Sequence, residues 1–139
     1  GGHSDTGMVP LIGKAVRNSV PISEFLSEER MSELVEATKV GGATLTGLLG
    51  TSAWYAPGAA AAQMVEAIIK DQRRVFPACV WMQGEYGISD MYLGVPVILG
   101  KNGIEKVIEL ELNKEEMDLL SQSATAVREV KAILDGMNS

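Results

Sequence analysis

Apolar residues recur at three- and four-residue intervals in three stretches of the chain, and this periodicity predicts three helices. The first is expected to begin after Ser27, a serine N-cap followed by two acidic residues, which favour the positive end of the helix dipole. Its pattern continues to Leu49 and is interrupted at Gly50. The residues expected on its inner face are Met31, Leu34, Val35 and Thr38.

The second helical stretch, residues 59–69, reads AAAAQMVEAII. Pro57 is compatible with this helix if it lies in the first turn, where a missing N–H leaves no hydrogen bond unmade. Because alanine covers every side, we expect a helix that is packed closely on several faces. Upstream, Gly41 and Gly42 favour close helix packing, with a loop as the alternative interpretation.

The third helix is expected from Asn113 to about Asp135. Asn113 and Glu116 have the spacing of a capping box, and Gly136 is the residue expected to end the helix.

Two apolar, β-branched runs, VFPACVWM at 75–82 and MYLGVPVILG at 91–100, indicate strands. The Asn102-Gly103 step is a strong hairpin signal, so we expect an antiparallel hairpin over 91–112 with 75–82 as a third strand. Residues 8–12 and 15–22 also have an extended pattern. The predicted fold class is α+β, with antiparallel strands packed against long helices.

A length of 139 residues with 46% hydrophobic residues fits one domain with its own core. The net charge of −6 and pI of about 4.8 argue against nucleic acid or an anionic membrane as a partner. No stretch is apolar enough for a membrane span, and the first residues have no signal-peptide pattern. The single cysteine, Cys79, is interpreted as a small core residue of a cytoplasmic protein.

The candidate chemistry centres on His3, the one histidine of the sequence. An imidazole exchanges protons near neutral pH and suits general acid–base catalysis. Without a second histidine or a ligand spacing, a metal site is not expected, and the phosphate-binding patterns G-x-x-x-x-G-K-[ST] and G-x-G-x-x-G are absent. By itself, Gly-Gly-His-Ser is equally typical of a vector-derived leader.

Three longer segments change this picture: GGHSDTGMVPL, VGGATLTGLLGTSAWYAPGAAAAQMVEAI and GEYGISDMYLGVPVILGKNGIEKVIELELN. Together they resemble, in the same order and over essentially the whole chain, the C-terminal half of the malate and lactate dehydrogenase superfamily. The chain is most similar to the NAD-dependent malate dehydrogenases of the lactate-dehydrogenase-like type. Residues 1–139 would then be a C-terminal catalytic and substrate-binding domain.

The resemblance implies that His3 is the proton-relay histidine of a G-[EG]-H-x-D motif. In the family this histidine takes the proton of the malate 2-hydroxyl as hydride leaves to NAD, and returns it when oxaloacetate is reduced. The residues that match structural positions of this loop are Gly2 and Asp5. Two departures lie in the same loop, because Ser4 replaces a common glycine and Gly7 resembles an insertion.

The GTSAWYAPG segment matches the family's substrate-side turn at the head of a helix. The resemblance places Ser52 and Ala53 at the border of the substrate pocket and Pro57 near the nicotinamide ring. Trp54 and Tyr55 are interpreted as packing in the core or at an interface.

The family's dinucleotide-binding domain, its substrate-clamping arginines and the aspartate partner of the histidine have no match here. The chain alone is therefore expected to bind no NAD and to be inactive, whereas the full-length enzyme would use NAD in the tricarboxylic acid cycle. Removal of a neighbouring domain, with the apolar segment 50–69, predicts a homo-oligomer, a dimer or tetramer. The alternatives are a lactate or other 2-hydroxy-acid dehydrogenase and a non-catalytic interaction module.

Overall fold

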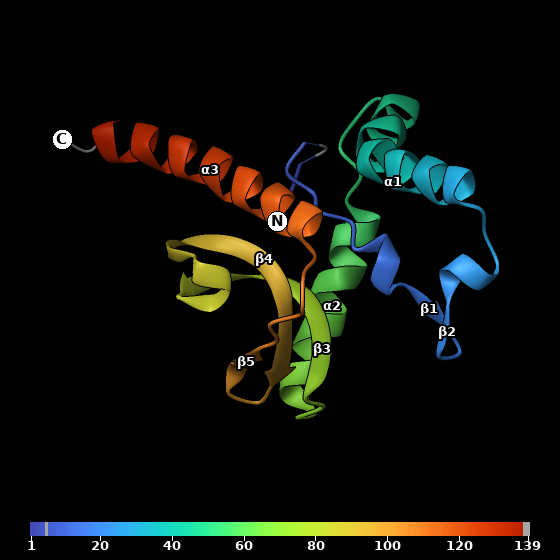
Figure 1. Cartoon of the computed structure of the whole chain (residues 1–139). Coiled ribbons are helices and arrows are strands. Elements are labelled where there is room, and N and C mark those ends of the chain that lie inside the picture. The colour runs from blue at the N-terminus through green and yellow to red at the C-terminus, as the bar shows by residue number, and fades with distance from the viewer. Residues whose placement is uncertain (5, 138–139) are drawn as a thin grey trace.

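Along the chain, a short hairpin is followed by two helices, a three-stranded sheet and a final long helix (Figure 1). The computed structural model describes residues 1–4 and 6–137. In chain order the elements are η1 (Ile12–Lys14), β1 (Val16–Arg17), β2 (Val20–Pro21), η2 (Ile22–Glu24), α1 (Glu28–Leu49), α2 (Tyr55–Ile69), β3 (Arg74–Gln83), η3 (Glu85–Gly87), β4 (Ser89–Gly100), β5 (Gly103–Val107) and α3 (Lys114–Met137). No helix in these ranges is both long and apolar enough to cross a membrane.

The main sheet has the antiparallel order β3-β4-β5, which confirms the predicted hairpin and its third strand. Gly103 begins β5 with a φ of +85°, a left-handed conformation that glycine adopts without steric cost. The strand ends at Val107, so residues 108–112 connect it to α3 instead of continuing the hairpin as predicted.

The core lies between β4 and α3. Alternate residues of β4 are buried, as a strand with one covered face requires. Leu120 and Ala124 of α3 pack into the same cluster. The buried residues of β4 in this cluster are Met91, Leu93, Val95 and Val97. Both α2 and α3 contact β4, which makes this strand the centre of the domain (Figure 1).

The predicted helix starts are confirmed. The Ser27 hydroxyl accepts a hydrogen bond from the Arg30 N–H at 3.3 Å. At α3, Asn113 and Glu116 form a reciprocal capping box, with both hydrogen bonds at 2.9 Å. The predicted end at Gly136 is wrong, because α3 continues to Met137. One glycine weakens a helix by about 1 kcal/mol but does not stop it.

The predicted inner face of α1 is not buried. Met31 and Val35 are half-buried, whereas Leu34 and Thr38 are exposed. Gly41 and Gly42 lie within α1, so the loop alternative is wrong, and a Cβ atom at Gly41 would meet no described neighbour within 4 Å. The periodicity identified the helix correctly, but the described chain covers its apolar side only in part.

The alanine-rich helix α2 is also less covered than predicted. Pro57 lies in its first turn as expected, but Ala67 is its one buried residue and Ala59–Ala62 are exposed. Trp54 and Tyr55 are 58% and 82% exposed, so they do not pack in the core. Cys79 does not pack in the core either, since its side chain is exposed. It lies on β3, which is an edge strand of the sheet.

The N-terminal extended stretches form little sheet. Residues 15–22 contribute the short β1–β2 hairpin, whose turn places Asn18 and Ser19 at φ values of +49° and +67°. In the stretch predicted over 8–12, no strand forms, and Ile12 begins the 3₁₀ helix η1. Proline at positions 10 and 21 limits backbone pairing here.

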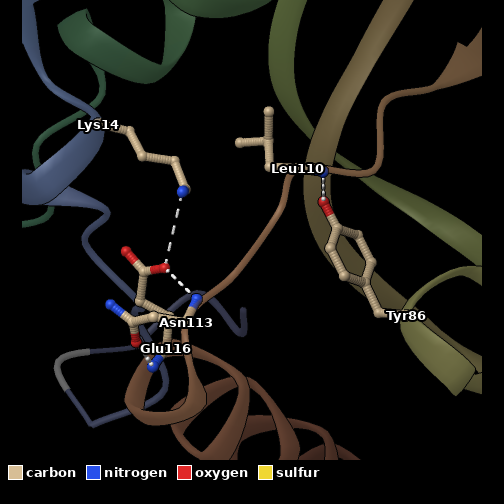
Figure 2. Close-up of polar contacts among 5 residues, drawn as sticks. All are labelled: Lys14, Tyr86, Leu110, Asn113 and Glu116. Atoms are coloured by element: carbon tan, nitrogen blue, oxygen red, sulfur yellow. Dashed lines mark hydrogen bonds and ion pairs between the residues drawn. The ribbon is translucent and has the colours of Figure 1, made fainter.

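The start of α3 is held by two separate polar contacts (Figure 2). The Tyr86 hydroxyl donates to the Ile108 carbonyl at 3.0 Å and accepts from the Leu110 N–H at 2.8 Å. On the other side, Lys14 forms an ion pair with Glu116 at 3.8 Å. Together these contacts set where the helix begins relative to the sheet.

We predict that Tyr86→Phe lowers the free energy of unfolding by about 1–3 kcal/mol, because the Ile108 carbonyl and the Leu110 N–H both lose a half-buried partner. Urea denaturation measures the change. Tyr92→Phe is the matched control, since Tyr92 is exposed and contacts Trp81 through its ring. Equal stability of both variants would contradict the anchoring role of Tyr86.

Candidate active site

The candidate site begins at Gly1, whose backbone pairs with that of Gly94 in β4. The Gly1 amino group donates to the Gly94 carbonyl at 2.7 Å, and the Gly94 N–H donates to the Gly1 carbonyl at 3.1 Å. A Cβ at Gly94 would lie 2.6 Å from the Gly1 oxygen, so glycine is needed for the close approach.

His3 is carried by a loop whose two ends, Gly2 and Gly7, are held by polar contacts. The Gly2 N–H donates to Ser123 Oγ at 2.6 Å, and the same hydroxyl donates to the Gly7 carbonyl at 2.8 Å. Within the loop, Ser4 Oγ accepts from the Gly7 N–H at 2.8 Å. The loop is therefore closed both internally and by a side chain of α3.

Ser4 and Gly7 are thus partners. A Cβ at Gly7 would lie 2.7 Å from Ser4 Oγ and 3.4 Å from the Gly2 Cα. Glycine at position 7 provides the room in which the serine hydroxyl reaches the backbone. Gly7 and Ser4 therefore act as one local unit.

His3 is exposed and lies where two cavities meet. One has a volume of about 750 Å³ and the other about 570 Å³, both within the range of small-molecule sites. The residues that line both cavities are Gly2, His3, Tyr92 and Val127. Within residues 1–4 and 6–137, the imidazole makes no hydrogen bond or ion pair, so it can exchange a proton with a ligand.

The other predicted site residues lie elsewhere. Ser52 is exposed and Ala53 half-buried in the connection before α2, and Pro57 is exposed in its first turn. None of the three lines either cavity, and no hydrogen bond in the described part of the chain joins them to His3. Asp5 lies outside the described residues. The roles of these residues stay predictions.

One residue of the site was missed by sequence reasoning. Ser123 belongs to the apolar periodic face of α3, together with Leu120, Ala124 and Val127. A serine in such a row is a signal that a polar group must be satisfied inside the core. For metals, the described residues contain no group of three or more His, Cys, Asp or Glu side chains that could hold an ion.

Residues 1–136 match the family described as lactate/malate dehydrogenase, alpha/beta C-terminal domain. The chain belongs to this family. The family's fold agrees with the α+β arrangement of antiparallel strands and long helices described above, so the predicted fold class is confirmed.

Individual relatives carry the same family names. The chain is 56% identical over 137 residues to a malate dehydrogenase of Cytophaga hutchinsonii, covering 99% of this chain and 44% of that protein. The structure of a malate dehydrogenase from Salinibacter ruber matches with a TM-score of 0.95 at 44% identity, covering 99% of this chain and 45% of that one. The chain therefore spans less than half the length of these relatives.

A lactate dehydrogenase shares the fold almost as closely. The crystal structure of the Eimeria maxima enzyme with NADH and oxamate has a TM-score of 0.93 at 38% identity, covering 98% of this chain and 44% of that one. The domain architecture is thus common to both branches of the family and does not distinguish them.

We predict that Gly7→Ala lowers the free energy of unfolding by about 1 kcal/mol, because the new Cβ displaces Ser4 Oγ from its hydrogen bond. In a Ser4→Ala background, where that bond is already lost, the same change should cost less than about half as much. Urea denaturation of the unsubstituted chain, the two single variants and the double variant measures this coupling. Gly13→Ala is the control, since a Cβ there meets nothing within 4 Å, and additive effects would contradict the Ser4–Gly7 unit.

Proposed function

We propose that this chain is the C-terminal catalytic and substrate-binding domain of a malate dehydrogenase that interconverts malate and oxaloacetate with NAD. The observation that carries the proposal is His3, held at the junction of two ligand-sized cavities, in a chain with 56% identity to a malate dehydrogenase over nearly its whole length. Family membership favours this enzymatic role over a non-catalytic interaction module.

In the proposed reaction, His3 is the proton-transfer residue. During oxidation the neutral imidazole accepts the proton of the malate 2-hydroxyl, and during reduction the imidazolium donates it to the developing alkoxide. The exposed position of His3 beside the cavities lets a substrate reach the imidazole directly. Gly2 and Asp5 are proposed to support the loop, and Ser52 and Ala53 to border the substrate.

The described residues do not fit the cofactor by themselves. The sequence has no G-x-G-x-x-G, and Pro57, proposed to approach the nicotinamide, lies outside both cavities. We therefore assign proton transfer, and not cofactor binding, to this chain. That the complete enzyme uses NAD is supported by lactate dehydrogenases of the family crystallised with NADH or nicotinamide adenine dinucleotide.

Malate is preferred over lactate as the proposed substrate because the curated relatives at 52–58% identity are malate dehydrogenases. Lactate dehydrogenases match at 38% identity. A lactate or other 2-hydroxy-acid dehydrogenase is the second candidate, and a comparison of turnover with malate and lactate separates the two. A place in the tricarboxylic acid cycle belongs to the same proposal. So does a cytoplasmic location, which a sequence without a cysteine pair supports.

We predict that His3→Ala, in the complete dehydrogenase that carries this chain, lowers kcat for malate oxidation by roughly 10²–10⁴-fold, the usual contribution of a positioned acid–base group. The affinity for NAD should change little, since His3 is assigned to the substrate. Steady-state kinetics and NAD titration check both. The 139 residues alone should show no turnover, and near-normal turnover of the variant would exclude His3 as the proton relay.

The proposal includes a homo-oligomer, a dimer or tetramer, formed through the exposed apolar surface of α1 and α2. The exposed apolar side chains of this surface include Leu48 at the end of α1, Trp54 and Tyr55 at the start of α2 and Ile69 at its end. Large exposed apolar patches are rare on monomers, and Trp and Tyr often dominate interface energies. The opposing effect is the net charge of −6, which favours separate chains.

We predict that the chain at high micromolar concentration has at least twice the mass of 14.8 kDa in light scattering after size exclusion. Trp54→Ala and Met64→Glu should weaken the association, because Trp54 is exposed at the start of α2 and Met64 is partly exposed on the same helix. Lys131→Ala is the control, since Lys131 pairs with Asp135 on α3. A mass near that of a single chain would contradict the oligomer.

A further inference from the structure

We propose that Ser123 is a positioning residue for the proton-transfer histidine, because its one hydroxyl ties together both ends of the loop that carries His3. The inference rests on the proposed function for its catalytic consequence. The structural part, that Ser123 holds the loop, can be tested without any turnover.

Ser123 is unusual in its surroundings. It is 4% exposed, and it is the one buried polar side chain among the described residues. Its hydroxyl accepts from the Gly2 N–H at 2.6 Å and donates to the Gly7 carbonyl at 2.8 Å, so its single proton is used. Figure 1 shows the N-terminus beside α3, as these contacts require.

The backbone leaves space for this hydroxyl at the glycine pair. A Cβ at Gly1 would lie 3.0 Å from Ser123 Oγ, and one at Gly2 would lie 3.4 Å away. Glycine at these positions lets the serine approach the chain from the side. The Gly-Gly pair before His3 and the serine on α3 are therefore complementary in shape.

The helix that carries Ser123 is itself held in place. Leu120 and Ala124 are buried in the core on either side of it. At its start, Glu116 closes the capping box and pairs with Lys14 (Figure 2). Because the helix is fixed, the Ser123 hydroxyl has a defined position. Its two hydrogen bonds therefore fix the two ends of the loop, Gly2 and Gly7.

His3 depends on these anchors because its imidazole has no hydrogen-bond partner of its own in the described chain. Its location is set by its described neighbours Gly2 and Ser4, which hydrogen bonds to Ser123 and Gly7 hold in place. When an acid–base group shifts by about 1 Å, the rate can fall by about 10²-fold, since proton transfer requires close alignment. Loss of the Ser123 hydroxyl should therefore affect catalysis more than folding.

The first experiment uses the 139-residue chain and the Ser123→Ala variant, in which alanine, the best helix former, preserves α3. Hydrogen exchange of the Gly2 amide should accelerate about tenfold or more, because it loses its acceptor. The ring C–H signals of His3, the one histidine of the chain, should sharpen as the loop gains motion. The amide of Leu120 reports whether the core is intact.

The matched control is Ser121→Ala, the same chemical change on the exposed side of α3, which should leave both readouts unchanged. Ser123→Thr retains the hydroxyl, and the adjacent 570 Å³ cavity offers room for its methyl group, so this variant should keep the slow exchange of Gly2. If Ser123→Ala does not fold, the threonine variant decides: fast Gly2 exchange would overturn the proposal.

The second experiment measures kinetics in the complete dehydrogenase. Ser123→Ala should lower kcat for malate about 10–100-fold with an unchanged KM for NAD, and Ser123→Thr should restore most of it. Unchanged Gly2 exchange, or faster exchange with unchanged kcat in an active enzyme, would overturn the inference. If the unsubstituted enzyme does not oxidise malate, the proposed function fails, and Gly2 exchange alone then decides whether Ser123 holds the loop.

Discussion

The packing of α3 across β4 is the contact on which the rest of the domain depends. One face of β4 supplies half of the buried apolar side chains of the core cluster, and α3 covers it through Leu120 and Ala124. Because the two elements come from different parts of the chain, their contact brings residue 123 next to residues 1–7. The same burial that stabilises the fold therefore also builds the support for the histidine loop.

The polar contacts around this core have a common effect. Tyr86 hydrogen-bonds to the connection that precedes α3, and Glu116 caps the first turn of this helix. Further along α3, Ser123 hydrogen-bonds to the loop that carries His3. Each contact uses a side chain to satisfy backbone groups that no strand or helix pairs, which is the general requirement for buried or half-buried backbone. The loop is thus held by the same kind of interaction as the helix end.

The apolar surface of α1 and α2 behaves differently. Both helices form with the predicted periodicity, but within the described chain only Ala67 of these two helices is buried. The apolar side chains exposed on these helices are of the types that usually lie in a protein core. This surface is consistent with the proposed oligomer and with relatives more than twice as long as this chain.

Local signals in the sequence were enough to predict the helices, the main hairpin and the helix caps. Ser27, the Asn113–Glu116 pair and the Asn102-Gly103 step act through neighbours within a few residues, so the sequence contains all their partners. The three family segments likewise identified the domain and its α+β fold class before any contact was known. His3 was recognisable as a candidate for the same reason, because its motif is local.

The tertiary structure decided what depends on distant partners. Periodicity cannot show whether an apolar face is covered, and so Leu34, Cys79 and the alanines of α2 were expected inside but lie exposed. The partners of Ser123 could not be predicted from its local pattern, since Gly2 and Gly7 are more than 110 residues away in sequence. Elements follow from local chemistry, whereas burial and the support of the site follow from which elements meet.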